Sequence, residues 1–198
     1  VSLTLTLTSP HFHSIIPFPI MTDANLLASV KKQVEFYFSD SAYRRDTFLR
    51  TAVANDSEGF VPITTLLTFN KLKQLTTDAA VVAEALKDSE TVIVSDDKTK
   101  LKRSEPLPDV DDSALRTLYV KGYPTDDAEV TIDSVREQFS VYGPINYVKL
   151  RRETGGENAV FKGSVFVEFS KEEDLQKAYK AANEGGSVQL SYKGTPFL

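Results

Sequence analysis

The sequence predicts an α+β protein built from two small domains in series. Its 198 residues exceed what one small domain usually needs, and 41% hydrophobic residues supply enough apolar side chains for two modest cores. Apolar residues recur at helical spacings in the first half, whereas strand-like and helix-like segments alternate in the second half. A stretch rich in proline and aspartate separates the halves. These observations predict a helical domain with a small sheet, then a linker, then helices packed on a larger sheet.

Residues 1–24 are expected to lie outside both domains, as a disordered or untranslated leader. Residues 1–20 contain no Lys, Arg, Asp or Glu, and Met21 is the only methionine, so we expect translation to begin there. Three prolines and the lack of basic residues argue against a signal peptide or a mitochondrial leader. The only histidines, His11 and His13, have no further ligand beside them, so no metal site is expected. No apolar run approaches the roughly 20 residues that a membrane-spanning helix requires.

Residues 25–104 are predicted to form a winged-helix-like domain. Apolar side chains three and four residues apart predict a first helix that ends near Ser39; they are Leu26, Val30, Val34, Tyr37 and Phe38. Further helices are predicted over residues 45–51, 63–69 and 79–86, the last with Thr77-Asp78 at its start. Short β runs at residues 92–95 and 100–103 flank the turn-forming Asp96-Asp97-Lys98. Helices followed by a small hairpin are typical of a winged helix.

Residues 114–198 are predicted to form a ferredoxin-like βαββαβ domain whose last strand is truncated. Strands are expected over residues 117–121, 145–152 and 163–169, and helices over residues 131–142 and 171–182. This βαββα order lacks one strand of the split βαβ fold, so we expect the chain to be a fragment of a longer protein. The linker of residues 105–113 is stiffened by Pro106 and Pro108 and is short enough to keep the two domains close.

Composition excludes several classes of function. The formal net charge is −5, but the acidity lies largely in the linker and both flanking segments are near neutral, so any nucleic-acid binding must be local. The absence of Cys excludes a disulfide scaffold, a thiolate metal site and a cysteine nucleophile. The sequence contains no Ser/His/Asp set, phosphate-binding loop or carboxylate pair with a partner base. We therefore expect no enzyme activity, no cofactor, no metal and no small-molecule substrate.

Two predicted strands of the second domain carry aromatic residues in a pattern that suits RNA. Residues 118–123 (LYVKGY) and 162–169 (KGSVFVEF) have the spacing of the two ribonucleoprotein signatures of an RNA-recognition motif. Strand alternation places Tyr119 on one face with Lys121, and Phe166 on one face with Ser164. Unpaired bases stack on such aromatic side chains, each worth roughly 1 to 3 kcal/mol. Because Ser164 stands where an aromatic is usual, one stacking position is missing.

Other interpretations of these strands remain open. Tyr119 and Phe166 could instead cover the sheet or dock another element of the protein. Lys149 and Arg151 could follow RNA phosphates, or they could form a solvated edge.

The first domain carries an amide, a carboxylate and several aromatics within a short span. Gln33, Phe36 and Tyr37 share a helix face, Asp46 and Phe48 follow a few residues later, and Phe69 comes next. Alone, these side chains could belong to a core. However, the sequence closely resembles the La motif in several blocks: QVEFYFSD (33–40), RDTFL (45–49), GFVP (59–62), FNKL (69–72), LTTD (75–78) and DKTK (97–100). With LYVKGYP (118–124), it resembles the N-terminal half of the authentic La proteins, the lupus La autoantigen family, of fungal type.

This resemblance implies binding of RNA 3′ ends that terminate in UUU-OH, the tail of nascent RNA polymerase III transcripts such as pre-tRNA. In the family, the glutamine matching Gln33 reads a uracil edge, and the aspartate matching Asp46 accepts hydrogen bonds from the last ribose's two hydroxyls. A carboxylate offers two acceptor oxygens to a diol and repels a 3′ phosphate. Phe36 and Phe48 match stacking aromatics, Tyr37 and Phe69 match residues that shape the pocket, and Lys32 and Arg44 are expected phosphate contacts.

The sequence departs from the La pattern at two places. Phe36 stands where the family usually has tyrosine, which keeps the stacking face and removes a hydroxyl contact. Ser39-Asp40-Ser41-Ala42-Tyr43 stands where the family generally has Gly-Asp-x-Asn-Leu, which changes the loop that leads to Asp46.

The leading hypothesis is a monomeric nuclear RNA chaperone, able to shuttle to the cytoplasm, that clamps oligo-U 3′ ends between its two domains and protects them from exonucleases. One alternative is a La-related protein dedicated to a specific RNA or to mRNA translation. Another is a protein-interaction module that binds peptides on its sheet face.

Overall fold

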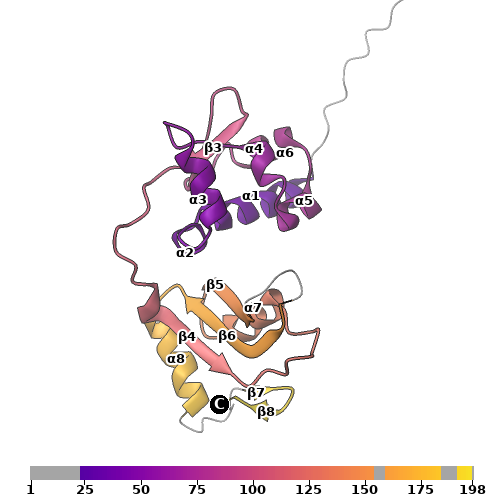
Figure 1. Ribbon diagram of the computed structural model, residues 1–198, viewed down its shortest axis with the longest axis vertical. Coiled ribbons are helices and arrows are strands. Elements are labelled where there is room, and N and C mark those ends of the chain that lie inside the picture. Colours follow the sequence, from indigo (N-terminus) through magenta and orange to yellow (C-terminus); the bar gives the residue numbers. More distant parts are fainter. Residues whose placement is uncertain (1–22, 154–158, 184–190, 198) are drawn as a thin grey trace, which may run out of the picture.

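The computed structural model describes residues 23–153, 159–183 and 191–197. The chain forms two domains, one above the other in Figure 1, joined by a segment that runs along one side of the molecule. Most of the predicted leader, including both histidines, lies outside the described residues. Its last two residues do not: Ala24 begins the first helix, and Asp23 caps that helix by accepting a hydrogen bond from the Asn25 amide.

The N-terminal domain consists of short helices around one long helix, with a small sheet at one end (Figure 1). The helices are α1 (Ala24–Phe38), α2 (Asp40–Tyr43), α3 (Thr47–Ala54), α4 (Ile63–Leu66), α5 (Asn70–Leu75) and α6 (Ala79–Ala85). The strands β1 (Val61–Pro62), β2 (Val92–Val94) and β3 (Lys100–Arg103) form an antiparallel sheet in the order β1-β3-β2.

The long first helix and the hairpin lie where the sequence predicts them. Three shorter elements, α2, α5 and β1, were not predicted, and the helix expected over residues 63–69 is wrong beyond Leu66. There the chain turns, Phe69 adopts an extended conformation, and a new helix begins at Asn70. Similarly, the helix expected from Arg45 begins at Thr47, because Asp46 is its N-cap.

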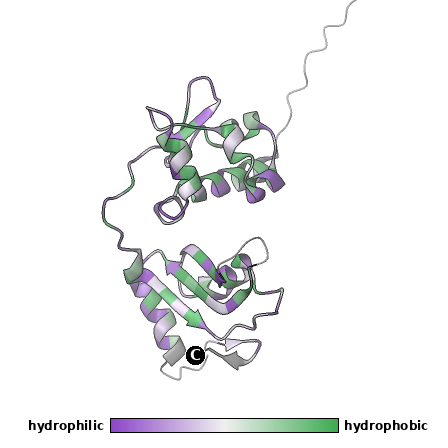
Figure 2. Cartoon of the chain, in the orientation of Figure 1, coloured by the Kyte–Doolittle hydropathy of each residue, from purple (hydrophilic) through white to green (hydrophobic). Residues whose placement is uncertain are grey.

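The N-terminal core forms where the apolar faces of the helices meet the sheet. Val30, Val34 and Phe38 recur every four residues along α1 and are fully buried. The other helices and β3 contribute Leu49, Ile63, Leu66, Leu72, Val82 and Leu101 to the same cluster. In Figure 2, hydrophobic and hydrophilic residues alternate along these helices, as expected for helices that bury one face. This core fixes the last turn of α1 against the start of α3.

The C-terminal domain is an antiparallel sheet covered by two helices. The short 3-10 helix η1 (Ser113–Arg116) leads into β4 (Thr117–Lys121), followed by α7 (Ile132–Ser140), β5 (Ile145–Arg152), β6 (Phe161–Phe169) and α8 (Glu172–Asn183). The sheet order is β4-β6-β5. This confirms the α+β class. The strands β7 (Ser191–Tyr192) and β8 (Thr195–Pro196) pair only with each other, so no fourth strand joins the sheet within the described residues.

Gly163 holds the ends of β4 and β6 together. Its φ of +67° suits glycine, and a Cβ atom there would lie 2.5 Å from the Tyr123 carbonyl oxygen. The Gly163 carbonyl in turn accepts hydrogen bonds from the Gly122 and Tyr123 amides at 3.0 and 3.1 Å. This close approach fixes the register in which Tyr119 lies opposite Phe166.

Candidate nucleic-acid interface

A pocket between the two domains gathers most of the side chains that the sequence singles out in the N-terminal domain. We call it the end pocket; its lining residues are Phe36, Tyr37, Ala42, Arg45, Asp46, Thr47, Phe48 and Tyr147. The last turn of α1 supplies two aromatics, and the turn before α3 supplies the carboxylate. Tyr147 comes from β5 of the other domain. The pocket is therefore a composite of both domains.

Asp46 is held in place by its own helix. Its Oδ1 accepts a hydrogen bond of 2.8 Å from the Leu49 amide, which caps the N-terminus of α3. Among the described residues, none donates a hydrogen bond to the second carboxylate oxygen of Asp46, Oδ2. The carboxylate is half-buried, so a ligand in the end pocket can still reach it. Asp46 thus offers one acceptor oxygen outright and shares the other with the helix.

The aromatic residues form a chain of ring contacts along one wall of the end pocket. Tyr37 meets Phe69 edge-on at 4.9 Å between ring centroids, and Phe69 lies 5.8 Å from Phe48. Phe48 is 57% exposed, which is unusual for a phenylalanine and leaves its ring open to a stacking partner. Phe69 lies behind these rings and supports them.

Gln33 lies one turn before Tyr37 on α1 and contacts it. Burial raises the pKa of the Tyr37 phenol above its usual value, while hydrogen bonds with the Leu72 backbone and the Gln33 side chain act in the opposite direction. Gln33 is half-buried. Its amide therefore stands beside the aromatic wall, although it is not among the residues that line the end pocket itself.

The two basic residues predicted near this pocket lie elsewhere. Lys32 is exposed and does not line it. Arg44 points to the linker, where it donates hydrogen bonds to the Pro108 carbonyl at 2.6 Å and the Val110 carbonyl at 3.4 Å. Its neighbour Arg45 lines the end pocket instead.

Like Arg45, Tyr147 lines the end pocket and was not among the residues that the sequence predicts there. Its ring is nearly parallel to that of Phe36, at 9° and 6.2 Å between centroids, and the Arg45 guanidinium lies 4.8 Å from its ring centroid. Burial raises the pKa of the Tyr147 phenol. Strand alternation places Tyr147 on the same face as Lys149 and Arg151, a signal that could have identified it.

The open face of the C-terminal sheet carries the second set of predicted residues. Tyr119 and Phe166 lie opposite each other on β4 and β6, with ring centroids 5.2 Å apart, and are 46% and 36% exposed. Arg151 covers Ser164: its Nη1 lies 3.3 Å from the Ser164 hydroxyl and 3.1 Å from the Tyr119 hydroxyl. The hydrogen bonds with Ser164 and Arg151 lower the pKa of Tyr119. Lys121 is exposed at the end of β4.

A second hollow joins the two sets of residues. We call it the sheet groove; it is lined by Arg45, Ser113, Ala114, Thr117, Tyr147, Lys149, Phe166 and Glu168. Arg45 and Tyr147 line both hollows. A continuous path therefore runs from Asp46, past Arg45 and Lys149, to the exposed Tyr119–Phe166 pair. It combines aromatic faces with cations, as binding of single-stranded nucleic acid requires.

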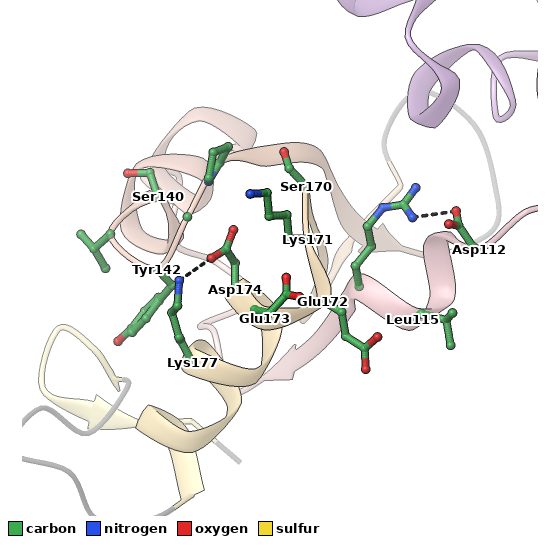
Figure 3. Close-up of a pocket in the computed structure, with 14 residues that line it drawn as sticks. Asp112, Leu115, Ser140, Tyr142, Ser170, Lys171, Glu172, Glu173, Asp174 and Lys177 are labelled. Carbon is green, nitrogen blue, oxygen red and sulfur yellow. Dashed lines mark hydrogen bonds and ion pairs between the residues drawn. The ribbon is translucent and has the colours of Figure 1, made fainter.

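Another hollow of the C-terminal domain is chemically unlike this path. Figure 3 shows it between the first turn of α8 and the turn after α7. Its lining includes Glu172 and Glu173, and its Asp174 is paired with Lys177 at 2.6 Å. Its four carboxylates outnumber its three cations, Arg116, Lys171 and Lys177, so this hollow attracts phosphate groups less than the path does.

The part of the chain that the structure describes holds no group of three or more His, Cys, Asp or Glu side chains placed to bind a metal ion. None of its helices combines the length and apolar character that crossing a bilayer demands.

Comparison with known proteins identifies both domains. A family model described as "La domain" matches residues 30–88, and one described as "RNA recognition motif" matches residues 118–187. Both are RNA-binding families rather than enzyme families.

The curated relatives that match this chain include La proteins and La-related proteins. "Lupus La protein homolog" of Rattus norvegicus is 38% identical over 184 residues, covering 88% of this chain and 41% of that protein. "La-related protein 7" of Danio rerio is 37% identical over 159 residues, covering 80% of this chain and 28% of that protein. "La-related protein 6A" of Arabidopsis thaliana is 36% identical over 177 residues, covering 83% and 41%. The chain thus spans less than half the length of these relatives.

A solved structure titled "La autoantigen N-terminal domain" is 44% identical to this chain, covers 43% of it and 92% of itself, and has a TM-score of 0.42. The La and La-related proteins match at nearly equal identity, so the comparisons support the two domains without selecting one branch, and they do not bear on the expected fungal type.

Proposed function

This chain is a La-domain protein in which an RNA recognition motif follows the La domain, and we propose that it binds RNA 3′ ends that finish in uridines with a free 3′ hydroxyl. One observation carries the proposal. The end pocket places a half-buried carboxylate beside an exposed aromatic ring, with residues of both domains around them. That combination suits the last nucleotide of a strand, which presents a base to stack and a ribose diol to donate hydrogen bonds.

The individual side chains support distinct parts of this recognition. Asp46 accepts from the ribose hydroxyls and repels a terminal phosphate. Phe48 stacks with a base, and the Gln33 amide, which can both donate and accept, pairs with a uracil edge. Arg45 takes the phosphate role that the sequence suggested for Arg44, because Arg45 borders both hollows along the path.

The RNA recognition motif extends the contact beyond the last nucleotides. Upstream bases stack on Tyr119 and Phe166. Lys149 pairs with Phe166 across the sheet, Arg151 lies beside the Tyr119 ring and Lys121 is two residues from Tyr119, so all three are placed to meet phosphates. In this proposal the protein acts as a monomeric nuclear chaperone that protects the uridine tails of RNA polymerase III transcripts from exonucleases.

A second candidate function uses the same pocket. The chain could be a La-related protein that serves one particular RNA or mRNA translation. The specific observation in its favour is that La-related protein 7 of Danio rerio matches about as well as the Lupus La proteins do. The two functions differ in which RNAs are bound in the cell, not in how the end is held.

The deciding experiment is a titration of the full chain with short RNAs that differ only at the 3′ terminus. We expect UUU-OH to bind at least tenfold more tightly than UUU-phosphate, since a hydrogen bond to a charged group contributes about 1.5 to 3 kcal/mol. An RNA ending in CCC-OH separates base recognition from end recognition. Equal affinity for the hydroxyl and phosphate ends would refute the assignment of Asp46.

A further inference from the structure

A buried carboxylate ties the two domains together behind the end pocket. Glu168 lies on β6, on the same sheet face as Phe166, which in a lone RNA recognition motif would face water. Here it is only 1% exposed. The Ser41 hydroxyl donates to its Oε1 at 2.6 Å, Arg45 Nη2 lies 3.0 Å from Oε2, and Arg116 Nη2 lies 3.3 Å from Oε1. We call Glu168, Ser41, Arg45 and Arg116 the carboxylate latch.

The members of the carboxylate latch come from three separate parts of the chain. Ser41 belongs to α2 and Arg45 to the turn that follows it, both in the La domain. Arg116 belongs to η1, where the linker ends. Burying a carboxylate is unfavourable unless hydrogen bonds and opposite charges compensate for the lost water. Arg116 precedes Thr117, the cross-strand partner of Glu168, and so belongs to the same domain, whereas the La domain supplies the Ser41 hydroxyl and the Arg45 charge. Glu168 is therefore buried in the domain arrangement that brings Ser41 and Arg45 to it.

The carboxylate latch is in direct contact with the end pocket through Arg45. Besides pairing with Glu168, the Arg45 side chain donates to the Ser41 carbonyl at 2.5 Å and to the Ser113 hydroxyl at 3.1 Å. Its guanidinium also lies over the Tyr147 ring, which in turn faces Phe36. One arginine thus connects the buried carboxylate to the side chain that the RNA recognition motif adds to the pocket.

The surrounding contacts restrain the same arrangement. Arg136 of α7 lies 5.7 Å from the Phe36 ring centroid, and Lys71 of α5 pairs with Asp133 of α7 at 2.8 Å. The second pair is well exposed and contributes little by itself. The only charge buried at this interface, within the described residues, is Glu168. Buried ion pairs add little net stability, yet they can select a single arrangement among several.

We propose that Glu168 is a positioning residue that fixes the RNA recognition motif against the La domain, so that Tyr147 completes the end pocket before RNA binds. The fixed arrangement follows from the carboxylate latch alone, whereas its effect on RNA binding rests on the proposed function. Glu168 itself need not touch RNA.

The test replaces Glu168 by glutamine in the full chain, which removes the charge and keeps the size of the side chain. Nitrogen-15 relaxation then measures how each domain tumbles. We expect one correlation time for both domains of the original protein, and two shorter ones for Glu168→Gln. We also expect about tenfold weaker binding of an oligo-U RNA, because the domains no longer act as one preassembled clamp. The preference for a 3′ hydroxyl over a 3′ phosphate should persist, since Asp46 lies within the La domain.

Two further variants make the result decisive. Glu172→Gln removes the same charge from an exposed site on α8 and should change neither tumbling nor affinity. Ser41→Ala removes only the hydroxyl of the carboxylate latch. It replaces Glu168→Gln in the test if that variant is unfolded at the temperature of the measurement. Tumbling as one body with unchanged affinity in both latch variants would overturn the proposal. If the original protein shows no preference for uridine tails, but the domains of Glu168→Gln tumble separately, the proposed function is wrong and the role of the carboxylate latch is supported.

Discussion

Asp46 serves the fold and the pocket with the same side chain. One oxygen caps α3 and so fixes the direction in which the other points. A carboxylate oriented in this way loses little entropy when it accepts a hydrogen bond from a ligand. The capping bond also separates the two roles experimentally, because asparagine caps a helix as well as aspartate but carries no charge.

We predict that Asp46→Asn leaves stability almost unchanged but reduces the preference for a 3′ hydroxyl over a 3′ phosphate at least several-fold, because the repulsion of phosphate is lost. Asp46→Ala should lose the same preference and also about 1 kcal/mol of unfolding free energy, since the cap is removed. Urea unfolding and RNA titration of both variants measure the two effects separately. An Asp46→Asn protein that still discriminates fully against phosphate would contradict this role.

Phe48 and its neighbour Leu49 provide a matched pair of positions. Phe48 is 57% exposed, whereas Leu49 is fully buried in the core. We predict that Phe48→Ala weakens binding of oligo-U RNA by about 1 to 3 kcal/mol, the usual contribution of stacking, with little change in melting temperature. Leu49→Ala should instead cost about 2 to 5 kcal/mol of stability, while the protein that remains folded binds normally. A collapse of the melting temperature in Phe48→Ala would mean that this ring is structural.

At the scale of elements, the β2–β3 hairpin is organised by a single carboxylate. Asp97 accepts hydrogen bonds from the Ser95 hydroxyl at 2.6 Å, and from the Thr99 hydroxyl and amide at 2.7 and 3.1 Å. These bonds, with that from Ser95 the largest cause, lower its pKa to about 2. The turn also holds Lys98 at a φ of +57°, a conformation that an ordinary side chain rarely adopts.

We predict that the Asp97 carboxyl titrates near pH 2, well below the usual value of about 3.9. Because the folded-state pKa is the lower one, Asp97 stabilises the hairpin fully above about pH 4, and this contribution is lost as the pH falls toward 2. Carbon-13 titration of the carboxyl group measures the midpoint, and amide exchange of the hairpin shows its opening in acid. A midpoint near 4 would show that these bonds are absent in solution.

Local patterns predicted the regular elements and missed those created by tertiary contacts. The alternation in β4 and β5 and the periodicity of α1 were sufficient to locate these elements. In contrast, β1 contains two residues, one of them Pro62, and exists because it pairs with β3. The short helix α2 starts at the cap that the sequence pattern assigned as the end of α1.

The same limit applies to the candidate site. The residue types in the La-domain pocket were identifiable, but adjacent arginines look alike in a sequence. The turn between α2 and α3 decides that Arg44 faces the linker and Arg45 the pocket. That Tyr147 faces Phe36 depends on how two domains meet, which no local pattern records.

At the scale of the whole molecule, the proposed function requires both domains to hold the RNA together. The La-domain core draws on residues from Leu26 to Leu107, so this domain has a complete core of its own. It lacks Tyr147 and the Tyr119–Phe166 pair when separated. Tethering makes the second contact intramolecular, at an effective concentration near millimolar.

We predict that the full chain binds a uridine tail of several nucleotides at least tenfold more tightly than a chain that ends at residue 112. Both should show a shallow salt dependence, because few phosphates are neutralised. Calorimetric titration of the two chains with one RNA at two salt concentrations tests both statements. Equal affinities would mean that the RNA recognition motif does not help to hold the 3′ end.

Because the carboxylate latch contains residues of both domains, substitutions in one domain affect which residues the other can accept. Ser41 and Glu168 meet at 2.6 Å across the domain boundary, so the effect of a substitution at either position on stability depends on the residue at the other. In a chimera that joins this La domain to the RNA recognition motif of a relative, each domain would fold, but the contacts between the domains would not match. Substitutions at this boundary therefore have to be compatible within the domain pair, and not only within the single domain.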